Sequence, residues 1–207
     1  MKKYLISFLL LLLLASCGEE STKPSDCSLY KLNMFNHPDT IAIDSYMGSI
    51  PDCIGDLTNL KVLGLYNNGI KVIPEAFFKL KNLDYFISLE NAYEFIPDKF
   101  DRLVSLRYLH IYNANMSKIP PSLFTLTSLI SLSFADSPID SIPDEIGNMI
   151  NLEDLNFNDT KISKLPSTIQ NLKGTLRKLE IIDTNVPQSE IDSLIKWLPN
   201  TEISYSP

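Results

Sequence analysis

Hydrophobic and polar positions recur along most of the chain with a constant period of 23. Each period is marked by Ile or Leu followed by a proline, at Pro51, Pro74, Pro97, Pro120, Pro143 and Pro166. A leucine stands at the same distance before each of the last five prolines, at Leu60, Leu83, Leu106, Leu129 and Leu152. Leu176 begins one further unit, displaced by one residue. A repeat of this length indicates a chain built from similar, stacked units.

Inward-facing leucines alternate with other residues inside each unit, as at Leu63 and Leu65. This alternation predicts a short strand with one face turned inward. A unit of this length is too short for a pair of helices but fits one coil of a solenoid. Because one coil cannot bury its own apolar residues, we expect the coils to share one core and their strands to form a parallel sheet.

The pattern Leu-x-x-Leu-x-Leu-x-x-Asn-x-Ile, seen from Leu60 to Ile70, resembles the leucine-rich repeat family. The resemblance extends over roughly residues 38–205. It implies an α/β fold, a right-handed solenoid or horseshoe with a parallel β-sheet on the concave face and short helical or irregular convex segments. We place the repeats at 60–186.

Three departures from the pattern affect the expected fold. Ile41 and Ile43 lie one place out of register, so we expect an N-terminal cap and an irregular first coil over 29–59. Ser88 replaces an inward leucine, which predicts a locally distorted strand. In the family, the Asn of the pattern bonds neighbouring backbone; here it persists at two positions and elsewhere becomes Ala114, Ser137, Thr160 and Thr184.

The C-terminal end needs a cover, because an open solenoid exposes its core. Helical spacing of apolar residues predicts an amphipathic helix there, with an inward face of Ile191, Leu194, Ile195 and Leu198. We expect Ser189 to cap the helix and residues 202–205 to add a last strand. Helix and strand together form the C-terminal cap, 187–207.

The N-terminus has a basic start and then an apolar run of about 11 residues, shorter than the roughly 20 that span a bilayer. This pattern predicts a signal peptide over 1–16. The run ends Leu-Ala-Ser-Cys, which resembles the lipobox of bacterial lipoproteins and implies acylation of Cys17. The alternative is an ordinary signal peptide with a chance cysteine.

Residues 17–28 are polar and predict a flexible tether between the lipid and the repeats. The protein would then be anchored to a membrane without spanning it. In Gram-negative lipoproteins Asp after the acylated cysteine favours the inner membrane, so Gly18 implies the outer membrane. The acidic residues that follow resemble the surface-export signals of Bacteroidetes lipoproteins.

The net charge is −7, and it becomes −9 once the signal peptide takes away two lysines and no acidic residue. Nucleic-acid binding is excluded, because it requires a basic face that neutralises phosphates. Export favours a disulfide between Cys27 and Cys53, which would link the N-terminal cap to the first coil. The alternative is two free thiols.

Residues that flank the inward leucines should line the concave face. In the N-terminal half these are mostly aromatic or apolar, and our predicted ligand-binding residues are Tyr66, Tyr85, Ile87, Tyr108, His110 and Tyr112. Exposed apolar clusters mark interaction sites, and tyrosine offers a large contact area with a polar tip. The resemblance implies a protein or peptide ligand. The alternative is that these rings only stabilise adjacent strands by cross-strand packing.

A row of polar residues follows the strands: Asn67, Glu90, Asn113, Asp136, Asp159 and Asp183. We interpret it as turn chemistry, because a linear row does not surround a cation. His110, Ser133 and Asp154 share the concave face, but a flat parallel sheet offers no oxyanion hole, so we expect no enzymatic activity. We expect a monomer without cofactor or metal. The alternative function is a structural or adhesion spacer of the cell envelope.

Overall fold

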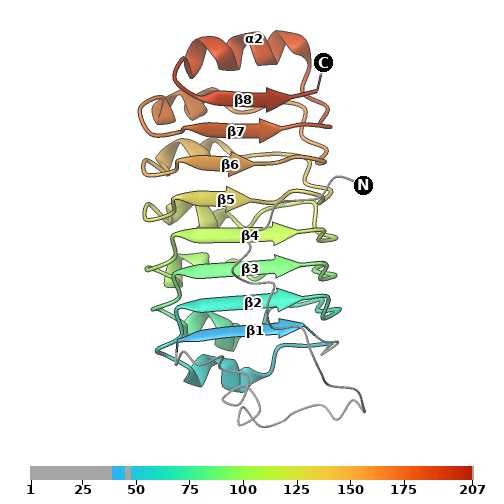
Figure 1. The fold of residues 1–207 in the computed structure, drawn as a ribbon, viewed down its shortest axis with the longest axis vertical. Coiled ribbons are helices and arrows are strands. Elements are labelled where there is room, and N and C mark those ends of the chain that lie inside the picture. The colour runs from blue at the N-terminus through green and yellow to red at the C-terminus, as the bar shows by residue number, and fades with distance from the viewer. Residues whose placement is uncertain (1–38, 45–47, 207) are drawn as a thin grey trace.

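The computed structural model describes residues 39–44 and 48–206, which form a stack of coils (Figure 1). Their strands make an eight-stranded parallel sheet in chain order. The strands are β1 (Thr40–Asp44), β2 (Val62–Tyr66), β3 (Tyr85–Leu89), β4 (Tyr108–Tyr112), β5 (Ser131–Ser133), β6 (Asp154–Asn156), β7 (Lys178–Ile181) and β8 (Glu202–Tyr205). The solenoid predicted from the repeat is confirmed.

Short 3-10 helices form the side of the stack opposite the sheet. They are η1 (Asp52–Asp56), η2 (Glu75–Lys79), η3 (Phe100–Arg102), η4 (Pro121–Thr125), η5 (Asp144–Asn148) and η6 (Ser167–Leu172). The proline of the repeated dipeptide stands immediately before each of them except η3, where Lys99 does. Proline fixes φ and supplies no backbone N–H, so it favours the extended segment from which a helical turn starts.

The pairing of the strands follows the spacing of the sequence pattern. Residues that pair between successive strands from β2 to β6 are 23 positions apart in the sequence, as are Val62 and Tyr85. The step is 22 between β1 and β2 and 24 at the two C-terminal pairs. Ile41 still lies opposite Leu63, and both are buried, so the first coil is one residue shorter but its strand is regular.

The core is a continuous column of inward side chains between sheet and helices. Phenylalanines thicken it near η2, where the rings of Phe77 and Phe86 lie 4.9 Å apart and those of Phe78 and Phe100 lie 5.7 Å apart. Burying such a side chain contributes roughly 1.5–3 kcal/mol. Stability is therefore distributed along the stack, each coil depending on its neighbours.

The distortion predicted at Ser88 is absent. β3 keeps all five residues and pairs in register with β2 and β4. The space left by the missing leucine is used by Tyr93, which is fully buried and whose hydroxyl oxygen accepts a hydrogen bond from the Ser88 hydroxyl at 2.8 Å. The small inward residue is compensated by a large one further along the same coil.

The Asn of the repeat joins one coil to the previous one. The Asn91 side-chain oxygen accepts from the backbone N–H groups of Asn68 and Ile70, both at 3.2 Å. Two coils later Ser137 partly replaces it, because its hydroxyl accepts from the backbone N–H of Ala114 at 3.1 Å. The threonines that follow bond only within their own coil, as at Thr160, whose hydroxyl donates to a carbonyl at 2.7 Å.

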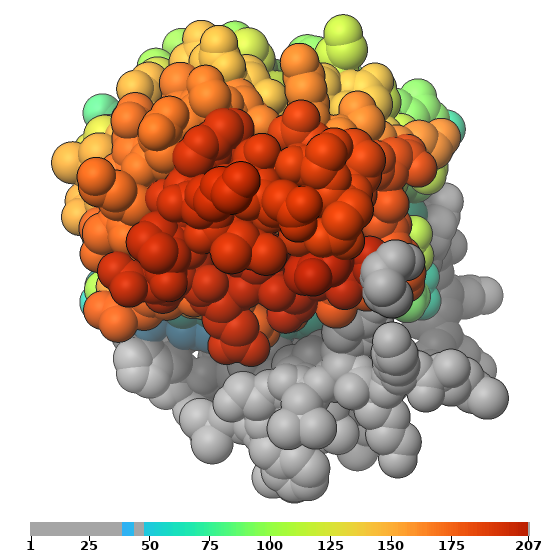
Figure 2. Space-filling view, turned by 90° about the horizontal axis from the view of Figure 1, so that it is seen from above, coloured from blue at the N-terminus to red at the C-terminus, as the bar shows by residue number. Residues whose placement is uncertain are grey.

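The C-terminal cap consists of α2 (Gln188–Trp197) and β8, which pairs with β7 as predicted. Figure 2 shows α2 and the last coil spread over this end of the stack. Two details of the prediction are wrong. Ser189 lies inside the helix, which starts after Pro187 and has no side-chain cap. Ile195 is 48% exposed, because the buried face is centred on Ile191 and Leu194 and residue 195 falls at its rim.

Candidate binding surface on the sheet

Strand register aligns the outward side chains into three rows on the face that points away from the core, here called the outer sheet face. The first row is Val62, Tyr85, Tyr108, Ser131, Asp154 and Lys178. The middle row is Gly64, Ile87, His110, Ser133, Asn156 and Glu180. The third row begins with Tyr66, Leu89 and Tyr112. Neighbouring strands lie about 4.8 Å apart, so residues in one row are adjacent.

Four rings on β3 and β4 form one contact network, the aromatic cluster: Tyr85, Tyr108, His110 and Tyr112. Tyr85 lies edge-on to Tyr108 at 5.7 Å and to His110 at 5.5 Å between ring centroids. His110 lies 6.0 Å from Tyr112. All four side chains are half-buried. Edge-on contacts hold the rings in place, so the cluster is a preorganised surface.

His110 lies at the centre of the cluster and contacts a neighbour through each ring nitrogen. Its Nε2 lies 2.9 Å from the Ser131 hydroxyl, and its Nδ1 lies 3.4 Å from the Tyr85 hydroxyl. Burial lowers the pKa of His110 to about 4. The imidazole is therefore neutral at pH 7. Ser131 was absent from the predicted site residues, although it occupies the same row as Tyr108 on the next strand.

Burial also raises the pKa of Tyr85, helped by the nearby Tyr112. Burial is likewise the main cause of the raised pKa of Tyr112, which an interaction with the Ser133 side chain partly offsets. Both hydroxyls stay protonated through the physiological range. Tyr85, His110 and Tyr112 are thus uncharged at neutral pH, and the aromatic cluster can offer ring surface and hydroxyl groups to a partner.

Two predicted site residues lie beside this cluster in unexpected positions. Ile87 is only 7% exposed, so it packs beneath its neighbours and offers little surface of its own. Tyr66 folds back over Gly64, since a Cβ added at Gly64 would lie 2.7 Å from the Tyr66 ring. The tyrosine therefore covers the part of β2 that has no side chain. The repeat pattern predicts that both residues lie on the outer sheet face. It does not show that Tyr66 lies flat against the sheet or that Ile87 is covered.

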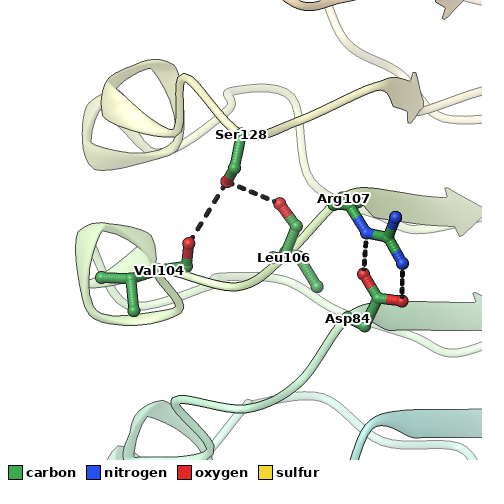
Figure 3. Close-up of polar contacts among 5 residues, drawn as sticks. All are labelled: Asp84, Val104, Leu106, Arg107 and Ser128. Atoms are coloured by element: carbon green, nitrogen blue, oxygen red, sulfur yellow. Dashed lines mark hydrogen bonds and ion pairs between the residues drawn. The ribbon is translucent and has the colours of Figure 1, made fainter.

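An arginine immediately before β4 adjoins the aromatic cluster and is not among the predicted site residues. The Arg107 guanidinium lies 5.7 Å from the centre of the Tyr108 ring, a cation–π arrangement. Its Nε and a terminal nitrogen donate to the two carboxylate oxygens of Asp84 at 2.5 and 2.6 Å (Figure 3). This contact raises the pKa of Arg107. Asp84 thereby sets the position of a charge at the border of the aromatic cluster.

Such cross-coil contacts recur where the strands begin. Lys61 pairs with Asp39 at 3.1 Å and Arg177 with Glu153 at 3.0 Å, in the same alignment as Arg107 and Asp84. On the loops before the strands, Ser128 donates to the Leu106 carbonyl of the previous coil at 2.9 Å (Figure 3). These contacts fix the spacing of the coils.

The C-terminal half of the outer sheet face is polar. Lys178 and Glu180 form an ion pair at 3.0 Å. Burial raises the pKa of Asp154, although it remains on the exposed side of the sheet. Asn158 is 8% exposed, and its side-chain oxygen accepts from the backbone N–H of Ile182 at 2.7 Å. Some of these polar side chains therefore form hydrogen bonds with backbone groups and are not available to a partner.

The polar row after the strands consists of turn residues, as predicted. All six have positive φ, between 51° and 56°: Asn67, Glu90, Asn113, Asp136, Asp159 and Asp183. Asn and Asp tolerate this left-handed conformation better than most residues. Within the described part of the chain, no group of three or more His, Cys, Asp and Glu side chains could hold a metal ion.

The serine–histidine–aspartate combination considered from the sequence is not assembled. His110 contacts Ser131 instead of Ser133, and its other nitrogen faces a tyrosine hydroxyl instead of a carboxylate. Ser133 is 2% exposed. A triad needs the histidine oriented by a carboxylate and able to take the serine proton. A histidine with a pKa of about 4 is a weak base at neutral pH.

The predicted N-terminal sites fall mostly outside the described residues. Cys17 and Cys27 both lie outside the residues that the structure describes. Cys53, at the start of η1, is disulfide-bonded and packs partly against the core. No helix of residues 39–44 and 48–206 is both long and apolar enough to cross a bilayer.

Comparison with known proteins identifies the repeat and the fold. The leucine-rich repeat family matches residues 59–80. A leucine-rich repeat protein of Leptospira interrogans shares 24% identity and a TM-score of 0.67, over 85% of this chain and 50% of its own. An internalin of Listeria monocytogenes shares 16% identity and a TM-score of 0.66, over 86% and 58%. The chain thus spans about half the length of these structures. No curated protein matched it.

Proposed function

We propose that this leucine-rich repeat solenoid is an exported, lipid-anchored binding protein whose outer sheet face recognises a protein or peptide partner. Leucine-rich repeat proteins generally mediate protein–protein interactions, and their fold typically serves as a non-enzymatic scaffold. The proposed anchor is an acyl group on Cys17 in the outer membrane, with residues 17–28 as the tether.

The aromatic cluster is the observation that carries the proposal. Tyr85, Tyr108 and Tyr112 are half-buried and are held by contacts with His110 or with each other. Held rings lose little conformational freedom when a partner covers them, so more of the contact energy appears as affinity. Cross-strand packing explains their contacts with each other. Strand pairing itself does not require the rings, because the shorter strands β5 and β6 pair in register without aromatic residues in these rows.

The test replaces each tyrosine by the residue that occupies the equivalent position one or two periods later in the chain. Tyr85→Ser and Tyr108→Ser copy Ser131, and Tyr112→Ala copies Ala135. Because these side chains already occur at equivalent positions, the triple variant should keep its strands. Partners would first be captured with the full chain by crosslinking on intact cells. Their affinity for wild type and variant would then be measured by surface plasmon resonance.

We expect the triple variant to bind at least about tenfold more weakly, since interface aromatic residues are frequent hot spots. A matched control changes three exposed apolar residues on other surfaces, Val72→Ser, Ile150→Ser and Ile195→Ser. The control should bind like the wild type. Equal affinity of the triple variant and the wild type would refute binding at the aromatic cluster, and absence of any specific partner would favour the spacer function.

A further inference from the structure

A basic cleft lies on the side of the solenoid opposite the outer sheet face. It has a volume of about 490 Å³ and is lined by Phe78, Lys79, Lys81, Arg102 and Val104. Lys79 ends η2 and Arg102 ends η3, so the two cations belong to neighbouring coils, one period of the repeat apart. Three of the five lining residues are cationic, in a chain whose net charge is −7.

These three cations differ from the charged residues that stand just before the strands. Just before the strands, opposite charges face each other across aligned coils, in the ion pairs of Asp39 with Lys61, Asp84 with Arg107 and Glu153 with Arg177. Within the described residues, none of the cleft's three cations forms an ion pair. Adjacent like charges repel, so gathering three cations here carries a small cost that a bound anion would offset.

The walls of the cleft hold the charges beside apolar surface. Phe78 is 1% exposed and forms part of the floor, whereas Val104 is 62% exposed at the rim. The stem of Lys79 is packed, since its Cδ lies 3.0 Å from where a Cβ on Gly55 would be. Asp101, next to Arg102 on η3, forms no ion pair in the described structure and leaves that guanidinium available.

We propose that this cleft binds a phosphate group attached to an organic molecule. A guanidinium binds two phosphate oxygens at once, and two ammonium groups supply further charge. The exposed Val104 side chain favours an organic substituent over the bare ion, because it can be covered by apolar atoms next to the charge. A small phosphorylated solute and the headgroup of an anionic lipid share this chemistry. The proposal does not depend on the partner bound by the outer sheet face.

The experiment follows the Val104 methyl NMR signals of the full chain. One arm titrates the protein in a neutral detergent with glycerol phosphate. The other compares the protein in phosphatidylcholine vesicles with and without phosphatidylglycerol. The cleft variant is Lys79→Gln with Arg102→Gln. Its control is Lys161→Gln with Lys164→Gln, which removes the same charge from two exposed lysines that form no ion pair in the described structure.

We expect a saturable shift of the Val104 signals in the wild type. The ligand concentration at half-saturation should rise about tenfold or more in the cleft variant and stay the same in the control. A shift with glycerol phosphate supports a soluble ligand. A shift only with phosphatidylglycerol, lost in the cleft variant, supports a lipid headgroup. If no arm shifts Val104, or if the control weakens binding as much as the cleft variant, the proposal is wrong.

Discussion

The Ser88 hydroxyl donates a hydrogen bond to the hydroxyl oxygen of Tyr93, 2.8 Å away, inside the core of the third coil. Ser88 also accepts from the side-chain amide of Asn91 at 2.9 Å, so the pair is connected to the ladder that joins the coils. In the coils on either side, the position of Ser88 is occupied by Leu65 and Ile111.

The first prediction concerns this pair. Ser88→Leu restores the repeat pattern but should destabilise the protein by roughly 1–3 kcal/mol, because Tyr93 already fills the space and loses its partner. Tyr93→Ile alone, which copies Ile70, should leave a cavity beside Ser88 and also destabilise. The double variant should recover much of the loss. Urea denaturation of all four proteins measures the coupling, and additive effects would show that the two residues do not compensate each other.

The second prediction is a pH dependence caused by His110. Its pKa is about 4 in the folded protein and 6.5 when unfolded, so between these values the unfolded state binds more protons. Stability should therefore fall as the pH decreases from 6.5 to 4, by at most roughly 3 kcal/mol from this group. Above pH 6.5 the effect should vanish.

The control for His110 is the variant His110→Asn, which copies Asn156 in the same row. The stability difference between wild type and variant should change across this pH window, because the effects of all shared carboxylates cancel in the difference. Denaturation at pH 4.5 and 7 provides the measurement. A difference that is the same at both pH values would contradict a buried, neutral His110.

The third prediction separates two glycines, Gly147 inside η5 and Gly174 in the turn before β7. A Cβ at Gly147 would lie 2.6 Å from the Thr168 backbone oxygen, so Gly147→Ala must push two coils apart and should cost roughly 1–3 kcal/mol. Nothing lies within 4 Å of a Cβ at Gly174. Gly174→Ala should be neutral or stabilise by about 0.4–1 kcal/mol, by restricting the unfolded chain. Thermal unfolding would check both, and equal behaviour would mean that the close contact at Gly147 is relieved cheaply.

The fourth prediction assigns the partner of the Cys53 disulfide. Export and the cysteine content point to Cys27. Peptide mapping of the exported protein without reductant should yield one peptide pair joined through Cys27 and Cys53. Cys27→Ser should leave Cys53 reactive towards a maleimide after export. An unreactive Cys53 in that variant would point to a different partner.

The fifth prediction concerns the anchor. Replacing Cys17 by Ser should remove the acylation site, and the processed protein should appear in the soluble fraction of cell extracts. Replacing Ser21 by Ala changes the tether without touching the proposed acylation site and serves as the control. Acyl labelling with a tagged fatty acid should mark the control and not the Cys17 variant. A Cys17 variant that stays membrane-bound would argue against the lipobox.

The repeat pattern was sufficient to predict the architecture because each coil meets the same environment as the next. Leu63 and Leu65 are inward and buried for the same reason as their counterparts one period away, so one short pattern predicts the sheet, the core and the turns. The residues after the strands illustrate this. All six adopt positive φ, including Glu90, whose side chain is not typical of that conformation.

Contacts between unlike neighbours could be decided only by the packed coils. Tyr93 fills the space above Ser88, Tyr66 folds over Gly64, and His110 selects Ser131. Each contact depends on the size and reach of a side chain on another strand or farther along its own coil. An alignment of the repeats does not contain this information. Periodicity therefore determines where a side chain points, whereas its neighbours' volumes determine what it touches and how much of it a partner can reach.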